Sequence, residues 1–429
     1  MLVIIFILSI VVIVLFSRKK TVKVDDESAY LTGNKNLNDK QVTNVIMATI
    51  IGGASTIGTA QLAYKYGLMG AIYTVSAGLA CYLLGRIFAV PLRKSNNITV
   101  TEFIGDYFGS GLQKYISFLS SLGLFIQLLA QLLAATAIIM SVFDLNFAIA
   151  FVASSVLVLI FVVSGGILSS DVLGKIKIVL IYLVLIISFV IIFFKTSGFE
   201  LFFNKIPNFS EFILGKKYPI NEILFDFVTS IVGVLSTQAY LQAIFSAKNF
   251  KAARNGAYRS ALIIPIIGVL SVFIGVYMRI VKPNLDVTLN VFPDFLRIVF
   301  PEFIAGFFLA AIFIVILGTC SGLTLSLATN IYVDFIKDRF KNVKLTEITK
   351  IRFIILVLIC MGLIMLVFGR DSSILKYTYV SMGLRGSTIL LPMVIIVFNK
   401  NISQNQYIRK IVKILPIIYI AWFIVSILP

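Results

Sequence analysis

The chain has 429 residues, of which 59% are hydrophobic and 13% are charged, and its mean hydropathy is +1.02. No soluble domain can bury that much apolar surface, so the composition predicts an all-α protein that crosses a bilayer many times. The net charge of +18 would suggest nucleic acid for a soluble protein, but its distribution argues against that partner. The three cysteines have no paired spacing and histidine is absent, so we expect neither a metal site nor an enzyme active site.

The first apolar segment runs from Met1 to Phe16, and Arg18 follows it closely. No basic residue precedes this segment, which distinguishes it from a cleaved signal peptide and predicts a first membrane helix with its N-terminus outside. Further apolar segments fall at 42–64, 69–92, 114–141, 146–168, 174–194, 223–246, 257–280, 302–328, 350–369, 378–398 and 410–428. Each can cross the hydrocarbon core with ~20 residues, so we expect about 12 helices and both termini outside.

The distribution of basic residues tests this orientation. Of the 37 Lys and Arg residues, 26 fall in segments expected inside, including Lys175 and Lys177, and 10 fall in segments expected outside. Arg385 lies within a helix. The excess on one side follows the positive-inside rule and predicts a multi-pass protein of the cell membrane. It also explains the net charge with the lipid bilayer, and without nucleic acid, as partner.

Two stretches predict interrupted helices. Gly52 and Gly53, followed by Ser55 and Thr56, lie in the middle of the second apolar segment. The same Gly-x-x-Ser-Thr pattern returns in residues 233–237. Freed backbone groups are tolerated at mid-membrane only inside protein or beside a wet cavity, and transporters use such breaks to bind ions and substrates. Glycine-rich packing between helices is the alternative.

Four motifs carry a family resemblance. The first break continues as Thr56-Ile-Gly-Thr-Ala-Gln-Leu-Ala-Tyr-Lys-Tyr-Gly67, and a basic turn follows as Leu92-Arg-Lys-Ser-Asn-Asn-Ile-Thr-Val-Thr-Glu-Phe103. Both resemble stretches of the sodium:solute symporter family.

The other two motifs lie in the second half of the chain. The seventh helix ends with Gln242-Ala-Ile-Phe-Ser-Ala-Lys-Asn-Phe-Lys-Ala-Ala-Arg-Asn-Gly256. The ninth contains Ala310-Ala-Ile-Phe-Ile-Val-Ile-Leu-Gly-Thr-Cys-Ser-Gly-Leu-Thr-Leu-Ser-Leu-Ala-Thr-Asn-Ile-Tyr-Val-Asp-Phe-Ile-Lys337. The four motifs occur in the order of that family, and the resemblance covers most of residues 41–400.

The resemblance implies an inverted-repeat fold of five plus five helices, first known from a bacterial leucine transporter. Residues 42–194 would form the first repeat and 223–400 the second, joined by an extracellular loop at 195–222. Residues 1–41 would supply a peripheral helix and a cytoplasmic loop, and 401–429 a peripheral last helix.

The resemblance also implies a site for Na⁺ as coupling ion. The family's ion ligands correspond to the carbonyl groups of Ala48, Ile51 and Val315 and to two consecutive hydroxyl positions, which here are Gly318 and Thr319. Glycine has no hydroxyl, so the resemblance implies a weakened site.

The resemblance also implies a position for an aspartate on the route by which the ion leaves. The family places an aspartate about eight residues after a Gly-Gly pair, and from Gly165-Gly166 that position is Gly174. Asp171, one turn earlier, is a candidate substitute. The alternative is an interfacial acid beside Lys175.

Polar residues around the breaks are candidates for substrate binding. They are Ser55, Thr56, Gln127, Gln131, Ser230, Gly233 and Thr237. Ser117, Ser120 and the two glutamines form one polar stripe on a helix, which should face the bundle rather than lipid. Hydrogen bonding between helices is the alternative for the glutamines.

Two charged residues complete the candidates. Asp226 lies on the helical face of Ser230, and either meets a cationic substrate group or lies in the outer interface. Arg385 is costly in a membrane unless it is paired, so it binds either an anion or carbonyl groups at a helix end.

Together these observations predict a secondary-active transporter, sodium-coupled, for a small amino acid or carboxylate-like metabolite, working by alternating access. A monomer would suffice. A symporter-like membrane sensor and a lipid-linked glycan flippase are the alternatives.

Overall fold

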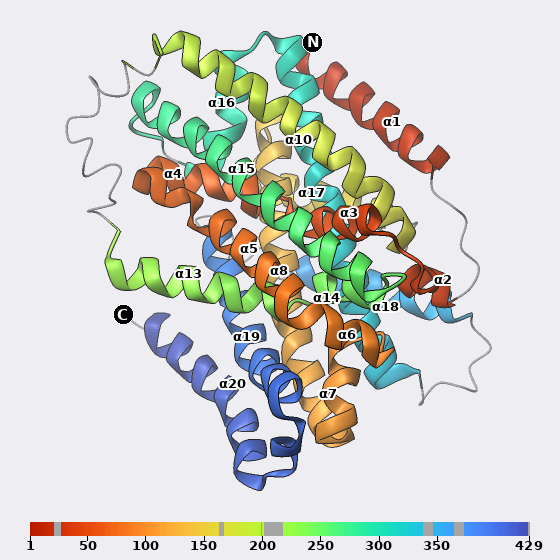
Figure 1. Cartoon of the computed structure of the whole chain (residues 1–429). Helices are drawn as coiled ribbons and strands as arrows, with labels where there is room; N and C mark the ends of the chain where they lie inside the picture. Colours follow the sequence, from red (N-terminus) through yellow and green to blue (C-terminus); the bar gives the residue numbers. More distant parts are fainter. Residues whose placement is uncertain are drawn as a thin grey trace.

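The computed structural model describes residues 1–20, 27–162, 167–198, 200, 218–285, 287–337, 346–363 and 373–427. These residues form helices joined by turns and loops, with an isolated β-bridge between Leu37 and Ala247 (Figure 1). The bridge joins the approach to α3 with the residues that follow α14, so it links the starts of the two halves of the chain.

The helices of the first half follow the apolar segments. They are α1 (Leu2–Lys20), α2 (Glu27–Thr32), η1 (Gly33–Lys35), α3 (Asp39–Ile50), η2 (Ala54–Gly58), α4 (Thr59–Tyr66), η3 (Gly67–Ala71), α5 (Ile72–Leu83), η4 (Leu84–Phe88), α6 (Ala89–Ser95), α7 (Val100–Phe108), α8 (Ser110–Phe143), α9 (Phe147–Val162) and α10 (Ile167–Lys195).

The second half is also helical. Its helices are α13 (Ile220–Leu235), α14 (Gln238–Phe245), α15 (Phe250–Val281), η5 (Thr288–Asn290), α16 (Val291–Val299), α17 (Glu302–Ile331), η6 (Tyr332–Ile336), α18 (Glu347–Gly362), α19 (Ile374–Asn399), η8 (Lys400–Gln404) and α20 (Gln406–Ile427).

Local sequence explains where key helices begin. The side chain of Asn38 accepts from the backbone of Gln41, and the side chain of Gln41 accepts from the backbone of Asn38, which caps the start of α3. Thr99 and Glu102 form the same reciprocal cap at α7. Such caps satisfy N–H groups that the first helical turn leaves free. These two caps fix where α3 and α7 begin.

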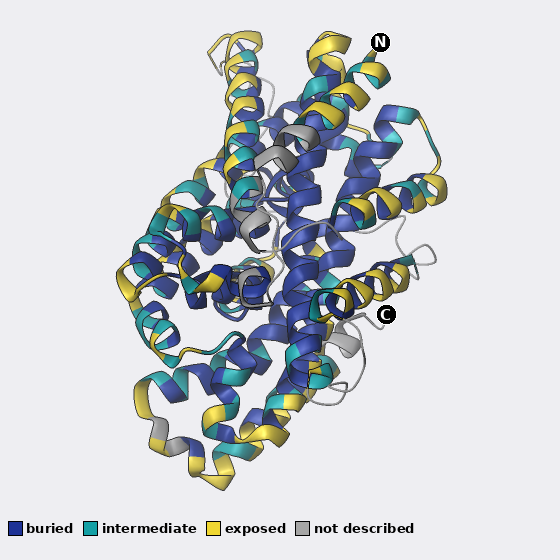
Figure 2. Ribbon diagram, turned by 90° about the vertical axis from the view of Figure 1, so that its right-hand side faces the viewer, coloured by how far each residue is buried: buried dark blue, intermediate teal, exposed yellow. Residues whose placement is uncertain are grey.

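The core of the molecule is built on two long helices. Most residues of α8 and α17 are buried, the two helices pack against each other, and α8 also packs against α19. Figure 2 shows buried residues concentrated along the middle of the molecule and exposed residues along its outer helices. Helices α3 and α10 pack together and against α17, so the break after α3 lies in the interior.

The outer surface is apolar. Large hydrophobic side chains exposed there include Phe118, Val156, Leu262 and Ile417. Among the described residues, 7 helices are long and apolar enough to cross a membrane, and Leu2–Ile13 and Phe147–Val162 form shorter apolar helices. An apolar surface of this kind is stable in lipid and not in water. The structure therefore supports a multi-pass membrane protein, and the number 12 stays a prediction.

The first and last helices lie at the edge of the molecule. Helix α1 packs mainly on α17, and α20 packs on α19 (Figure 1). That these two helices are peripheral to the transport core stays a prediction. The division into two five-helix repeats stays a prediction.

Candidate functional site

The first helix break lies between Ile51 and Gly53. Helix α3 ends at Ile50, Ile51 has an extended backbone, and a π-helical turn begins at Ala54. The Ser55 hydroxyl accepts from the Gly52 N–H at 3.0 Å, while the Gly53 N–H donates to Oε1 of Gln131 at 2.8 Å. Side chains thus satisfy the backbone groups that the break frees, as a buried break requires.

Both glycines are needed for close packing. A Cβ atom at Gly52 would lie 2.4 Å from Oγ1 of Thr319, and one at Gly53 would lie 2.1 Å from Cβ of Ala134. Helices α8 and α17 therefore approach the broken backbone so closely that no side chain fits. Gly52 and Gly53 therefore both form the break and allow α8 and α17 to pack against it.

The second break lies between α13 and α14. Helix α13 ends at Leu235, Ser236 leaves the helical conformation, Thr237 is extended, and α14 begins at Gln238. The Thr237 hydroxyl donates to the carbonyl group of Gly233 at 2.6 Å. The two Gly-x-x-Ser-Thr stretches thus adopt interrupted helices, although their local geometry differs.

The structure brings the proposed ion ligands together. The Thr319 hydroxyl lies 2.5 Å from the carbonyl oxygen of Ile51 and 3.2 Å from that of Val315. Both Thr319 and the carbonyl group of Ala48 accept hydrogen bonds from Nζ of Lys177, at 2.6 and 2.5 Å. The group between these oxygens is therefore a lysine side chain of α10.

Lys177 is the residue that the sequence analysis missed. The charge distribution placed it with Lys175 on the cytoplasmic side, whereas Lys177 is 0% exposed and its neighbour Lys175 is exposed. A signal was present, because Lys177 lies three residues inside an apolar segment and a buried charge there requires partners.

Gly174 explains how α10 comes so close. A Cβ atom at Gly174 would lie 1.9 Å from the carbonyl oxygen of Asn44 on α3, so the family's aspartate does not fit at this position. The side chain of Asp171, the alternative ion-exit candidate, lies outside the described part of the structure. Gly165 and Gly166 also lie outside it. Its role stays a prediction.

The remaining substrate candidates are buried but mostly bonded. The hydroxyl groups of Thr56 and Ser230 donate to carbonyl groups of Gly52, at 2.8 Å, and Tyr73, at 3.3 Å. Gln131 holds the first break. Ser120 donates to the backbone and Ser117 to Asp334, at the far end of the α8 stripe. These residues hold the two breaks and the N-terminal part of α8 in place.

Arg385 differs from them because its charge is unmatched. It is 0% exposed, and its Nε donates to the Ser381 carbonyl group at 3.1 Å. Within the described part of the chain, neither Nη1 nor Nη2 has a hydrogen-bond partner. Tyr73 of α5 and Tyr240 of α14 lie close enough to interact electrostatically with the guanidinium group. Buried charges are normally paired, so Arg385 is a candidate for binding an anion.

The same face of α8 connects this arginine with the first break. Gly123 makes room for Cγ of Arg385, Gln127 lies beside Tyr240, and Gln131 contacts Gly53. Residues spaced by four lie on one side of a helix. The polar stripe on α8 therefore runs along the interior between Arg385 and the ion site.

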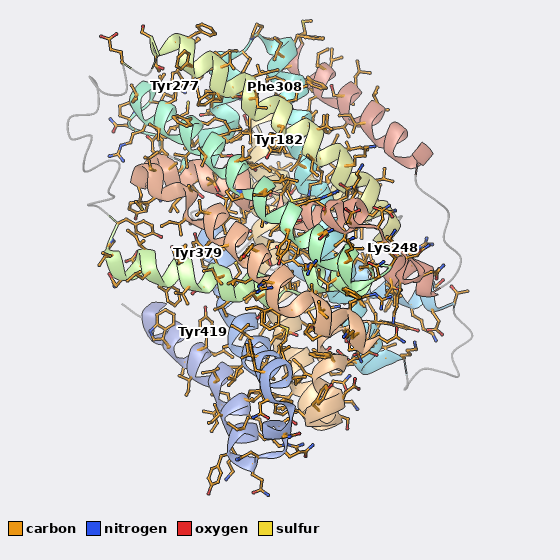
Figure 3. All side chains as sticks on the ribbon, viewed as in Figure 1. Tyr182, Lys248, Tyr277, Phe308, Tyr379 and Tyr419 are labelled. Atoms are coloured by element: carbon orange, nitrogen blue, oxygen red, sulfur yellow. The ribbon has the colours of Figure 1, made fainter. Side chains whose placement is uncertain are left out.

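An open cavity of about 660 Å³ lies on the side expected outside. It lies between α4, α13, α19 and α20, and Figure 3 shows Tyr379 and Tyr419 of its wall on the side opposite Lys248. The ring of Tyr379 packs at 6.2 Å on that of Tyr73, the neighbour of Arg385.

Asp226 lies in this cavity's wall and is bonded to a tyrosine. Burial, together with the nearby Asp226 carboxylate, raises the pKa of Tyr218 above its ordinary value, so the hydroxyl keeps its proton and donates to Asp226. Tyr218 also stacks on Tyr66 with ring centroids 4.4 Å apart. Asp226 thus belongs to the lining of the entrance.

Comparison with known proteins agrees with this architecture. The sodium:solute symporter family matches residues 30–406. The sodium/pantothenate symporter of Haemophilus influenzae is 25% identical over 77% of this chain and 69% of its own length. A high-affinity choline transporter of Drosophila melanogaster is 23% identical over 82% of this chain and 59% of its own length.

The structural likeness is broader than the sequence identity. A Na⁺-coupled sialic acid symporter superposes with a TM-score of 0.74 over 97% of this chain and 95% of its own, at 16% identity. At that identity the likeness shows the fold, which confirms the predicted all-α, leucine-transporter-like class. Because the family match extends over most of the chain, including both helix breaks, the protein is a member of the sodium:solute symporter family.

Proposed function

We propose that the protein carries a small metabolite with a carboxylate group across the membrane by alternating access. Membership of the family makes the protein a secondary transporter rather than an enzyme, and supports sodium-coupled symport of a small metabolite. The two interrupted helices supply the binding centre, and the cavity between α4, α13, α19 and α20 supplies the route of entry.

One observation carries the choice of a carboxylate. Arg385 is fully buried, both of its Nη atoms lack a partner in the described residues, and it lies between helices of both halves of the chain. A guanidinium group presents two parallel N–H donors that match a carboxylate. Pantothenate and sialic acid, named for two of the related transporters, both contain a carboxylate, while choline is a cation.

Substrate uptake tests this proposal. We would reconstitute the protein into proteoliposomes and measure uptake of radiolabelled pantothenate, sialic acid and choline, then competition by other small carboxylates. We expect at least one carboxylate to be transported or to compete, and choline to do neither. Uptake of choline alone would contradict the assignment of Arg385.

We further propose that the protein lies in the cell membrane with both termini outside, because basic residues concentrate on the opposite side. The candidate residues all come from one chain, so a monomer would suffice for transport. In this orientation the cavity beside Tyr379 opens outward.

A further inference from the structure

We infer that the ε-ammonium group of Lys177 takes the place of a sodium ion at the site formed by Ala48, Ile51, Val315 and Thr319. The inference rests on the proposed function, because it concerns the ion site of a transporter. It concerns this site alone, so sodium that drives transport would have to bind elsewhere in the chain.

The contacts of Nζ are those of a bound cation. Nζ donates to the Ala48 carbonyl oxygen at 2.5 Å and to Oγ1 of Thr319 at 2.6 Å. The Thr319 hydroxyl in turn donates a hydrogen bond to the carbonyl oxygen of Ile51, 2.5 Å away. An ammonium group is a compact positive charge with three donors, so it binds the same neutral oxygens that a monovalent metal ion would use.

The missing hydroxyl and the lysine explain each other. A Cβ atom at Gly318 would lie 2.7 Å from Cδ of Lys177 and 3.4 Å from its Nζ. The stem of the lysine therefore occupies the space in which the family's hydroxyl-bearing side chain would lie. Glycine at 318 removes one ion ligand and at the same time admits a tethered cation.

A second glycine sets the lysine in position. Gly174 brings α10 against the backbone of Asn44 on α3. Lys177 lies one turn after Gly174, and Ala48 lies one turn after Asn44, so the same approach places Nζ beside the Ala48 carbonyl group. The two departures from the family pattern, at 174 and 318, thus form one arrangement with Lys177.

A second cation would be unfavourable at this site. Lys177 is fully buried, and no acidic side chain in the described residues forms an ion pair with it. Among the described residues, its ammonium group donates to one carbonyl group, that of Ala48, and to one hydroxyl group, that of Thr319. A sodium ion at the same oxygens would meet a like charge within a few ångströms without any carboxylate to compensate.

Sodium binding to the purified full-length protein tests the inference without any substrate. We would count ²²Na⁺ ions bound per chain for the wild type, Lys177→Ala, and the double variant Lys177→Ala with Gly318→Ser. We expect the double variant to bind one more sodium ion per chain than the wild type, and about tenfold more tightly than Lys177→Ala alone, because it regains a hydroxyl ligand. Adding Thr319→Ala should remove the gain.

The neighbouring lysine provides a matched control. Lys175→Ala removes an exposed charge on the same helix and should bind as many sodium ions as the wild type. A folded double variant, monodisperse in size-exclusion chromatography, that binds no more sodium than the wild type would overturn the inference. A wild type that takes up no carboxylate, with a sodium ion gained by the double variant, would instead count against the proposed function alone.

Labelling of the wild-type protein keeps the inference testable if the variants fail to fold. We would treat the protein with an amine-reactive reagent in increasing NaCl or KCl and quantify modified lysines by mass spectrometry. Lys175 should react throughout, and Lys177 should stay unmodified at every sodium concentration. Sodium-dependent modification of Lys177 would show that sodium displaces it, and the replacement would then be wrong.

Discussion

Single residues decide what the interior can bind. Gly318 is buried where a larger side chain would meet Lys177. Lys177 and Arg385 are buried charges, and a buried charge depends on the few groups around it. A membrane interior penalises unmatched charge more than water does. Substitutions at these positions should therefore have effects that reveal their partners.

Gly318→Ser by itself should destabilise the protein rather than improve a sodium site. The new Cβ atom would lie 2.7 Å from Cδ of Lys177, and overpacking of a tight core costs about 1–3 kcal/mol. Thermal unfolding in detergent should show a lower Tm for Gly318→Ser than for the wild type. The same substitution in the Lys177→Ala background should not lower Tm, because the lysine stem is gone. An equal loss of Tm in both backgrounds would contradict this explanation.

Arg385→Met should abolish uptake of the carboxylate substrate while the protein remains folded. Removing the guanidinium group removes a charge-assisted bidentate contact, and each hydrogen bond to a charged group is worth about 1.5–3 kcal/mol. Arg385→Lys keeps the charge and loses the planar pair of donors, so we expect uptake with a KM raised about tenfold or more. The measurement is initial uptake in proteoliposomes.

Exposed arginines supply the comparison for Arg385. Arg297 lies outside the core, where it forms an ion pair with Asp144 at 3.1 Å. Arg297→Met should leave uptake within about twofold of wild type. Equal losses for both variants would mean that total charge, and not the buried guanidinium group, governs uptake.

At the scale of elements, breaks and close contacts position these residues. Helix α3 stops before Gly52 because the side chains of Ser55 and Gln131 replace helical hydrogen bonds. Helices α8 and α17 then pack against bare backbone. The geometry depends on glycine at two adjacent positions, and this dependence can be tested.

Gly53→Leu should abolish transport, and Gly53→Ala should reduce it strongly. A Cβ atom at 53 would lie 2.1 Å from that of Ala134, and residues other than glycine also favour a continuous helix. Uptake and membrane insertion would be measured together. Gly111→Ala, on α8 where nothing lies within 4 Å of the added atom, is the control and should transport normally. Wild-type uptake by Gly53→Leu would mean that the break has no role in transport.

A buried carboxylate connects the ends of three elements. Asp334 in η6 accepts hydrogen bonds from Thr101 of α7 and Gln113 of α8, both at 2.7 Å, and from Ser117 at 2.5 Å. Asp334→Ala should destabilise the protein by about 3 kcal/mol, because it leaves buried donors without an acceptor. Thermal unfolding would measure the loss. Asp106→Ala, at an exposed carboxylate of α7, should change stability by less than about 0.5 kcal/mol.

At the scale of the whole molecule, orientation in the membrane determines which cavity opens to which side. Lys248 is exposed at the side where basic residues concentrate, opposite Tyr379 and Tyr419 (Figure 3). It precedes Asn249, whose side chain caps α15 and is better left intact. A probe at 248 therefore reports orientation with little effect on stability.

A cysteine at 248 should react with an impermeant thiol reagent only in inside-out vesicles. The background would be Cys360→Ser, because Cys81 and Cys320 are buried and Cys360 is exposed. Reaction in intact cells would reverse the orientation and place the cavity beside Tyr379 on the cytoplasmic side.

The sequence by itself determined the class of the protein. Hydropathy gives the apolar helices, because a helix in lipid must be apolar along its outer face, and glycine pairs give the breaks, because glycine lacks a Cβ atom. The motifs from Thr56 to Lys337 led to the family, which the match to residues 30–406 confirms. These properties depend on residues that are close together in the chain, so they can be predicted from the sequence.

Only the tertiary structure showed which side chain lies among the proposed ion ligands. Counting charges along the chain assigned Lys177 to the cytoplasmic side. The count could not show its contact with Thr319, because the two residues are 142 positions apart in sequence and meet only in the folded protein. Gly318 similarly looked like the loss of one ligand, until the structure placed Cδ of Lys177 in the vacated space. The partner of a buried charge comes from whichever helix packs against it, and packing is a property of the whole fold.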